Sequence, residues 1–233
     1  MTLASQPLID AVDAAASADE LLRAVRDLAA ASHPRVERDA LTCLVKVLGF
    51  NNPGAAVAAV DGLIAAGPAA VEPLLDGLDD HNYGARAWAV RALAGIGDVR
   101  GLELLEQALG QDIGPSVRRA AARGLGQLQL AELPADQAEA VRERCLLALE
   151  RSVVDAEWVV RYAVSVALES LATSLAPGDE RHQRAVAALG RLGHADQEDT
   201  LVVRQRASLA LQRRSEEHTS ELQSHSDLVC RLL

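Results

Sequence analysis

The sequence predicts an all-α protein in which helical pairs stack into a right-handed α-solenoid. Apolar residues make up 49% of the 233 residues, yet aromatic residues make up only 2%. Most of the apolar residues are Ala, Leu and Val, and Ala and Leu are strong helix formers. Val, Ile, Thr and aromatic residues are too few to build many strands. A repeated segment is the third observation, and it sets the order of the elements.

The repeat is clearest in the middle of the chain. GAAVAAVDGLIAAG at 54–67 aligns without a gap on GARAWAVRALAGIG at 84–97, 30 residues later. Related segments follow as VRRAAARGLGQL at 117–128, VRYAVSVALESL at 160–171 and VRQRASLALQ at 203–212. Units that each bury an apolar stripe against their neighbours are typical of solenoids. We therefore predict that each segment is the first helix of a pair.

Second helices are predicted between these segments. PAAVEPLLDGLDD at 68–80 and VRGLELLEQALGQD at 99–112 follow the first two of them. Upstream, the segments at 18–32 and 35–50 are predicted to be an earlier pair. The chain is thus expected to hold about five helical pairs.

Proline, glycine and alanine are placed as this arrangement requires. Pro68 and Pro115 suit first helical turns, and Gly67 and Gly97 suit helix ends. Small residues are expected where the first helices touch: Ala89, Ala92, Ala121, Gly124, Ala163 and Ala167. One equivalent position is expected to form the core stripe: Leu93, Leu125, Leu168 and Leu211.

Charge and composition exclude several classes of protein. The net charge of −10 argues against non-specific binding of nucleic acid. The N-terminus has no secretory signal, and no run approaches the roughly 20 apolar residues that cross a bilayer. Three scattered cysteines form no C-x-x-C pair and no metal-ligand pattern. We predict a soluble cytoplasmic protein without a metal site and without membrane insertion.

The last segment, RSEEHTSELQSHSDLVCRLL, differs from the rest of the chain. One interpretation is a solvated, disordered acidic tail. We favour another, because RSEEHTSELQSH is the translation of a widely used sequencing adapter and DLVCRLL is the translation of its continuation. Residues 1–213 are therefore predicted to be the repeat domain and residues 214–233 a foreign tail. His218, His225 and Cys230 would then have no function.

Arginines recur at one equivalent position of the first helices: Arg86, Arg118, Arg161 and Arg204. Acidic residues precede them: Asp79 and Asp80, Asp112, Asp155 and Asp199. We predict an Asp–Arg ladder that ties one repeat to the next by charge-assisted hydrogen bonds. Whether any one of these arginines belongs to the ladder or contacts a ligand stays open.

Aromatic residues accompany two of these arginines. Tyr83 and Trp158 occupy equivalent positions, each three residues before an arginine, Arg86 and Arg161 respectively. Residues three apart lie on one helical face. These four residues therefore form two equivalent pairs of an aromatic ring and a guanidinium.

A second such pair follows within the same segment. Trp88 and Arg91 repeat the spacing, and Tyr162 lies beside Arg161. A Trp in an Ala-rich core can simply fill space, and a Tyr at a helix start can pack locally. The alternative is a surface for a flat, conjugated, anionic ligand, with rings stacked on Tyr and Trp and carboxylates held by Arg.

These segments resemble a known family. LGFNNPGAAVAAVDGLIAAG, HNYGARAWAVRALAGIGDVRGLELL, SVRRAAARGLGQL and EWVVRYAVSVALESL together are similar to the phycobilin lyases with HEAT-like repeats, and among them to the F-type (beta) subunits of phycocyanin alpha-subunit phycocyanobilin lyases. The resemblance covers nearly all of residues 5–213. It implies a solenoid of about five HEAT-like repeats.

The resemblance also implies an activity. Such a subunit pairs with a homologous E-type subunit and presents an open-chain tetrapyrrole, phycocyanobilin, to the apo-phycocyanin alpha subunit, whose cysteine adds to the bilin to form a thioether. Phycocyanobilin is then a transferred substrate, and no permanent cofactor is implied. The rings and two propionates of a bilin suit the aromatic and arginine residues above. The candidate bilin-binding residues are Asn82, Tyr83, Arg86, Trp88, Arg91, Trp158, Arg161 and Tyr162.

Candidate catalytic residues lie next to the aromatic cluster. Asp79 and Asp80 could hydrogen-bond the pyrrole nitrogens, and His81 could act as an acid. Relatives that isomerise the bilin carry an adjacent His-Cys element; no such pair occurs here, which favours simple attachment. Cys43 and Cys145 are interpreted as small core residues. Two alternatives stay open: a lyase for another bilin, such as phycoerythrobilin on phycoerythrin, and a protein-binding scaffold without a small ligand.

Overall fold

The computed structural model describes residues 5–31, 37–77 and 82–214, and every regular element in these ranges is a helix, as predicted. The α-helices are α1 (Gln6–Asp13), α2 (Ala18–Ala31), α3 (Arg38–Val47), α4 (Pro53–Ala66), α5 (Val71–Asp76), α6 (Tyr83–Ile96), α7 (Leu102–Gln111), α8 (Pro115–Leu125), α9 (Ala135–Arg151), α10 (Trp158–Thr173) and α11 (Glu180–Gly193). A further helical run covers residues 201–214. Three short 3₁₀ helices join them: η1 (Gly67–Ala70), η2 (Val99–Gly101) and η3 (Ser152–Val154).

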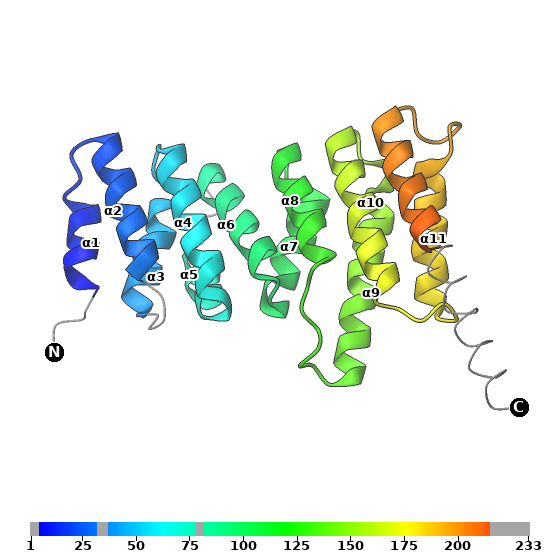
Figure 1. Cartoon of the computed structure of the whole chain (residues 1–233), viewed down its shortest axis with the longest axis horizontal. Coiled ribbons are helices and arrows are strands. Elements are labelled where there is room, and N and C mark those ends of the chain that lie inside the picture. Colours follow the sequence, from blue (N-terminus) through cyan, green and yellow to red (C-terminus); the bar gives the residue numbers. More distant parts are fainter. Residues whose placement is uncertain (1–4, 32–36, 78–81, 215–233) are drawn as a thin grey trace, which may run out of the picture. The chain divides into compact units, whose positions relative to one another are not determined.

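The chain divides into two compact units, Met1–Glu132 and Leu133–Leu233. The first unit contains α1 to α8, and the second contains α9, α10, α11 and the helix at 201–214 (Figure 1). From α2 to α11 the helices follow one another as five consecutive pairs in the described chain, which confirms the predicted repeats. Helix α1 precedes them and was not predicted.

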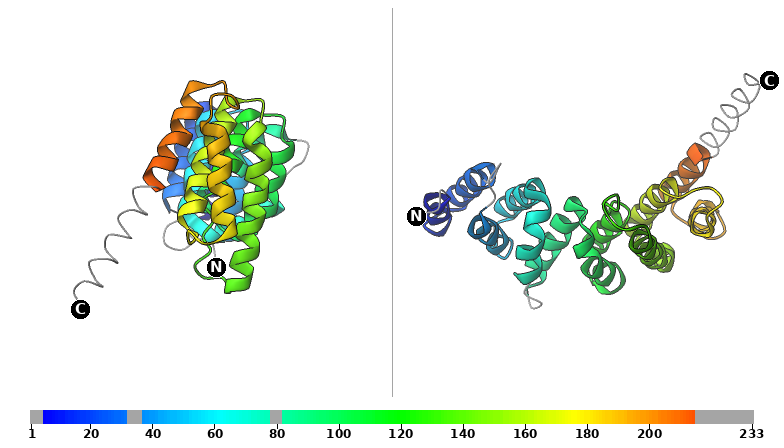
Figure 2. Two further views of the ribbon diagram at one scale, coloured as in Figure 1. Left: turned by 90° about the vertical axis from the view of Figure 1, so that its right-hand side faces the viewer. Right: turned by 90° about the horizontal axis from the view of Figure 1, so that it is seen from below.

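The first unit is built in two layers. Helices α2, α4, α6 and α8 contact one another in succession, and α3, α5 and α7 lie against them on one side (Figure 2). The first helices of the predicted pairs therefore form one layer and the second helices the other. This is the arrangement in which each repeat buries its apolar stripe on its neighbours.

Equivalent signals begin and end α4 and α6. The side chains of Asn52 and Asn82 each accept a hydrogen bond from the backbone N–H three residues later, at 3.0 Å. Both are N-caps, which satisfy backbone donors that the first helical turn leaves unpaired. Gly67 and Gly97 follow the two helices with φ of 64° and 72°, a conformation that glycine adopts without strain. The predicted ends at these two glycines are confirmed.

Small residues let the first helices approach closely, as expected. A Cβ on Gly124 of α8 would lie 2.8 Å from Cα and Cβ of Ala94 on α6. The six small residues predicted at helix contacts are all buried. Leu93, Leu125 and Leu168 are at most 2% exposed, whereas Leu211 is only half-buried. Leu211 belongs to the last described helix, so no further described repeat covers it.

In the second unit, α10 packs against α11 and also meets the helix at 201–214. Val203, Ala207 and Ala210 of that last helix are fully buried. Arg206 forms an ion pair with Glu169 of α10. The last helix is therefore an integral part of the second unit.

One stretch, Pro53–Asp76, is by length and composition apolar enough to cross a membrane, with a mean hydropathy of 1.6 over its best window. It is not one uninterrupted α-helix, because η1 separates α4 from α5. Ala55, Ala59 and Leu63 of α4 are fully buried within the first unit. Packing between neighbouring repeats accounts for the apolar composition of this stretch.

Candidate functional site

The predicted site begins at the first turn of α6. Asn82, a candidate bilin-binding residue, caps this helix, so the carbonyl oxygen of its side chain is occupied by the backbone N–H of Ala85 at 3.0 Å. Tyr83 is the first helical residue and is 41% exposed. Asn82 thus fixes where the helix starts, and Tyr83 offers an aromatic ring to solvent at that point.

Tyr83 and Arg86 contact each other and the loop before α8. The Arg86 guanidinium carbon lies 5.6 Å from the centre of the Tyr83 ring, within the range of a cation–π contact. Arg86 Nε donates to Asp112 Oδ2 at 3.2 Å, and Asp112 is buried. A Cβ on Gly114 would lie only 1.7 Å from the Tyr83 hydroxyl oxygen, so the phenol rests directly on this glycine. Both side chains therefore join one repeat to the next.

Asp112 holds this loop in shape. Its Oδ1 accepts the backbone N–H of Gly114 at 2.8 Å while its Oδ2 binds Arg86. Arg118 of α8 donates to the Asp112 carbonyl oxygen at 2.9 Å. Beside the Arg86–Asp112 pair lies a cavity of about 170 Å³, walled by Val90 of α6 and by Leu104 and Gln107 of α7.

Trp88 and Arg91 lie on a different face of α6. Five residues separate Trp88 from Tyr83 and Arg91 from Arg86, which is a rotation of about 140° around the helix axis. The Arg91 guanidinium carbon is 5.1 Å from the centre of the Trp88 ring. The structure therefore forms both predicted aromatic–arginine contacts on α6 but divides them between two faces.

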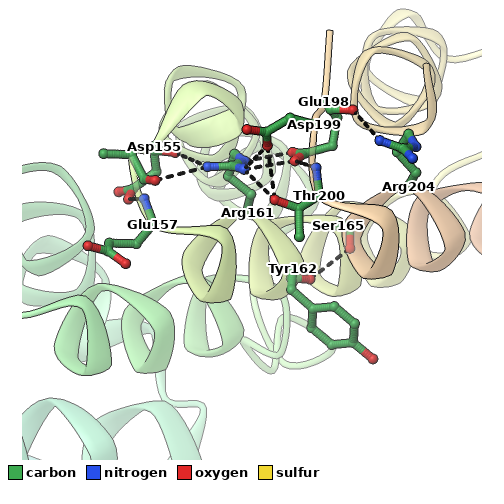
Figure 3. Close-up of polar contacts among 10 residues, drawn as sticks. Asp155, Glu157, Arg161, Tyr162, Ser165, Glu198, Asp199, Thr200 and Arg204 are labelled. Carbon is green, nitrogen blue, oxygen red and sulfur yellow. Dashed lines mark hydrogen bonds and ion pairs between the residues drawn. The ribbon is translucent and has the colours of Figure 1, made fainter. Parts of the chain in front are cut away.

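In the second unit, Arg161 is surrounded by acceptors (Figure 3). Its Nε and Nη2 donate to the two carboxylate oxygens of Glu198 at 2.6 and 2.7 Å. Its Nη1 donates to the backbone carbonyl oxygens of Asp155 and Ala156 at 2.7 and 3.1 Å. Burial by itself raises the pKa of Glu198, but hydrogen bonds from Arg161 and from the Thr200 N–H lower it to about 2.

Trp158 and Tyr162 do not share this environment. Trp158, the first residue of α10, is 47% exposed. Figure 3 shows the Tyr162 ring directed away from the Arg161 cluster, on another side of α10. The predicted grouping of Arg161 with Tyr162 is thus not formed, because adjacent helical residues point about 100° apart.

The described residues contain a link of the predicted kind in each unit, whereas the predicted members Asp79 and Asp80 lie outside them. Arg86 reaches Asp112, whose backbone carbonyl binds Arg118; in the same way Arg161 reaches Glu198, whose backbone carbonyl accepts from Arg204 at 2.8 Å. Asp199, the carboxylate predicted from the sequence for the last position, does form an ion pair with Arg161. It approaches Arg161 at 3.2 Å, but its side chain is 91% exposed, whereas that of Glu198 is 1% exposed.

A signal for Glu198 was present in the sequence. It lies six residues before Arg204, as Asp112 lies six before Arg118 and Asp155 six before Arg161. Counting this spacing, rather than searching for aspartate, identifies the buried partner. Gly114 was also missed, because only the tertiary contact with Tyr83 shows why it is needed.

The catalytic candidates Asp79, Asp80 and His81 lie outside the described residues. Within the described ranges no group of three His, Cys, Asp or Glu side chains could hold a metal ion. Cys43 and Cys145 are buried, as predicted, and burial raises the pKa of the Cys43 thiol. Neither thiol is placed to react with a ligand at the surface.

Similarity to known proteins extends over most of the chain. A family model of HEAT repeats matches residues 44–126 and 71–169. The phycobilisome maturation protein of Synechococcus elongatus is 48% identical over 204 residues, which cover 87% of this chain and 95% of that protein. The phycocyanin alpha phycocyanobilin lyase CpcF of Synechocystis sp. is 53% identical over 165 residues, which cover 71% of this chain and 75% of that protein.

A solved structure shares the fold as well as the sequence. It is the complex of CpcE and CpcF of phycocyanin lyase from Nostoc sp. PCC7120, one chain of which matches with a TM-score of 0.66 and 37% identity. The match covers 75% of this chain and 99% of that chain. With its repeat fold and this extent of similarity, the chain belongs to the phycobilin lyase family with HEAT-like repeats, among the F-type (beta) subunits.

Proposed function

We propose that this chain is one subunit of a heterodimeric bilin lyase that binds phycocyanobilin and promotes its thioether attachment to a cysteine of the phycocyanin alpha subunit. One observation carries the proposal: this chain is 53% identical to a phycocyanin alpha phycocyanobilin lyase over 71% of this chain and 75% of that protein. The related chain in the complex of CpcE and CpcF supports pairing with an E-type subunit. We further propose a cytoplasmic location, which the similarity to a phycobilisome maturation protein supports.

The reaction adds a thiol across a carbon–carbon double bond. The sulfur of the acceptor cysteine bonds to the ethylidene carbon of the bilin, and the proton that balances the addition is taken up by the bilin. The acceptor supplies the nucleophile, so this chain needs none, which agrees with the burial of Cys43 and Cys145. Its contribution is to hold the bilin at the right distance and angle and to exclude competing reactions.

The exposed aromatic residues are the best placed to contact the bilin. Tyr83 and Trp158 are 41% and 47% exposed, so each can offer a ring face to a conjugated pyrrole system. Trp88 is half-buried and has Arg91 stacked on it, so it offers less of its ring than Tyr83 or Trp158. Arg86 and Arg161 already bind the carboxylates of Asp112 and Glu198, so their first role is to hold the repeats together.

Protonation of the bilin makes it more electrophilic, and Asp79 and Asp80 remain our candidates for stabilising the protonated form. His81 remains a candidate acid. The absence of an adjacent His-Cys pair in the sequence supports attachment without isomerisation. Two other functions are outcomes of the test below: transfer of another bilin, such as phycoerythrobilin to phycoerythrin, and a scaffold that binds only proteins.

The test is to co-express the chain with an E-type subunit, phycocyanobilin and the apo-phycocyanin alpha subunit. After denaturing electrophoresis, bilin fluorescence on the alpha subunit reports a covalent adduct, since a non-covalent bilin is lost. We expect a fluorescent band that requires this chain. If a band forms only when phycoerythrobilin and phycoerythrin replace phycocyanobilin and the phycocyanin alpha subunit, the substrate must be reassigned. If no bilin gives a band, the result favours a scaffold that binds only proteins.

A further inference from the structure

A second concave surface of the first unit lies between α6 and α8. It is a groove of about 260 Å³, and its floor is made of small residues, among them Ala94, Gly95 and Ala120. The close approach of Gly124 to Ala94 brings the two helices together beneath it. Arg91 of α6 and Arg119 and Arg123 of α8 stand along its sides, and all three are exposed.

The positive charge of the three arginines in this groove is not balanced by acidic residues that line it. No acidic residue lines it, and neither α6 nor α8 contains an Asp or a Glu. Among the described residues, none of the three arginines forms an ion pair within 4 Å, and Asp61 on the neighbouring α4 pairs with none of them. Arg86 and Arg161 differ from these three arginines, because each forms an ion pair with a buried carboxylate. In a chain of net charge −10, this groove is a local concentration of positive charge.

Repulsion between the guanidinium groups is destabilising, and an anionic ligand would relieve it. Arg119 and Arg123 are four residues apart on one helix, and like charges at that spacing are mutually destabilising. Arg91 is held in place by its stacking on Trp88 at 5.1 Å, a contact that leaves guanidinium N–H groups free to donate. Guanidinium groups bind carboxylates through two parallel hydrogen bonds, so three of them suit a ligand with two carboxylates.

We propose that Arg91, Arg119 and Arg123 form a dicarboxylate site that holds the two propionate groups of the bilin, an inference that rests on the proposed function. Arg119 and Arg123 are thereby added to the binding residues, and Arg86 and Arg161 are set apart from them as links between repeats. Bound there, the ligand would lie with Arg91 between its carboxylates and the Trp88 ring.

The test compares phycocyanobilin with its dimethyl ester, in which both propionates are neutral, on the chain in complex with an E-type subunit. Absorbance titration gives the dissociation constant of each form for the wild type and for Arg119→Gln/Arg123→Gln. We expect the wild type to prefer the free acid by about 10- to 100-fold, and the double variant to lose that preference while binding the ester unchanged. Arg119→Lys/Arg123→Lys should restore part of it, because lysine keeps the charge without the planar fork.

A matched control carries the same change of charge elsewhere in the first unit. Arg23→Gln/Arg26→Gln alters two exposed arginines of α2 and should keep the preference for the free acid. A wild type that binds acid and ester equally would overturn the dicarboxylate site and leave the lyase proposal standing. A wild-type complex that binds neither form would overturn both. A double variant that keeps the preference but no longer captures the apo-alpha subunit would show that the groove binds an acidic protein surface instead.

Discussion

At the residue scale, Glu198 shows how the second unit is held together. It is 3% exposed, it receives two hydrogen bonds from Arg161, and its Oε1 also accepts the Thr200 N–H at 2.8 Å. Asp199 is the adjacent residue and approaches the same guanidinium, but from solvent. The two neighbouring carboxylates thus differ mainly in burial, which makes them a matched pair for measurement.

Glu198→Gln is expected to lower the free energy of unfolding of the second unit by about 2 to 3 kcal/mol, because it removes a charge-assisted pair and leaves the mostly buried Arg161 without its main carboxylate. Asp199→Asn should change it by less than about 0.5 kcal/mol, since an exposed pair contributes little. Chemical denaturation followed by circular dichroism measures both. Equal effects of the two substitutions would contradict the assignment of Glu198 as the structural partner.

The lowered pKa of Glu198 makes the stability of the second unit depend on pH. The folded-state pKa of Glu198, about 2, lies below the ordinary value of 4.5, so its contribution is complete above about pH 4.5 and is lost as the pH falls toward 2. Hydrogen bonds from Arg181 also lower the pKa of Asp179 to about 2. Asp179 is present in the wild type and in Glu198→Gln, so its effect on the pH dependence of stability is common to both. The difference in stability between wild type and Glu198→Gln should therefore shrink between pH 5 and pH 2. A difference that stays constant over that range would argue against the paired carboxylate.

At the element scale, two faces of α6 carry different aromatic–arginine pairs. One face carries Tyr83 and Arg86 and fixes the loop before α8 through Asp112. A face about 140° away carries Trp88 and Arg91 beside the groove. The helix also depends on its close contact with α8, where Gly124 meets Ala94.

Gly124→Ala is expected to destabilise the first unit by about 1 to 2 kcal/mol. The added methyl group would lie 2.8 Å from Ala94 Cα and Cβ, a cost that exceeds the gain in helix propensity. Gly110→Ala in α7 is the control, because a Cβ there meets nothing within 4 Å. It should be neutral or stabilising by up to about 1 kcal/mol, as measured by urea unfolding. Similar losses at both glycines would mean that close helix packing is not the reason for Gly124.

At the scale of the whole molecule, the two units each end in a helix of the first-helix type, α8 in one and residues 201–214 in the other. The last helix contributes buried Val203, Ala207 and Ala210, and Arg214 donates to Thr173 of α10 at 3.2 Å. The predicted foreign tail, from Arg214 onward, lies outside the described residues except for Arg214 itself. The described helix therefore runs one residue past the predicted boundary at residue 213.

A chain of residues 1–214 is therefore expected to keep the unfolding free energy and the bilin transfer of the full chain. A chain of residues 1–200 should lose several kcal/mol of stability in the second unit, because it exposes the faces of α10 and α11 that the last helix covers. Thermal unfolding and the electrophoresis assay check both chains. Loss of stability in the 1–214 chain would contradict the interpretation of the remaining residues as a foreign tail.

The sequence by itself determined the helical class, the order of the pairs, the ends at Gly67 and Gly97 and the family, because repeat spacing and local helix signals act over a few residues. Only the tertiary structure decided which charged residues are engaged. The packing of neighbouring repeats buries Glu198 and leaves Asp199 exposed. It also brings Arg86 into an ion pair with Asp112. The short distance along the chain between Tyr83 and Trp88 suggested one cluster. The five residues that separate them turn α6 by about 140°, so the two rings lie on different faces, and only the packing of α6 shows what each face meets.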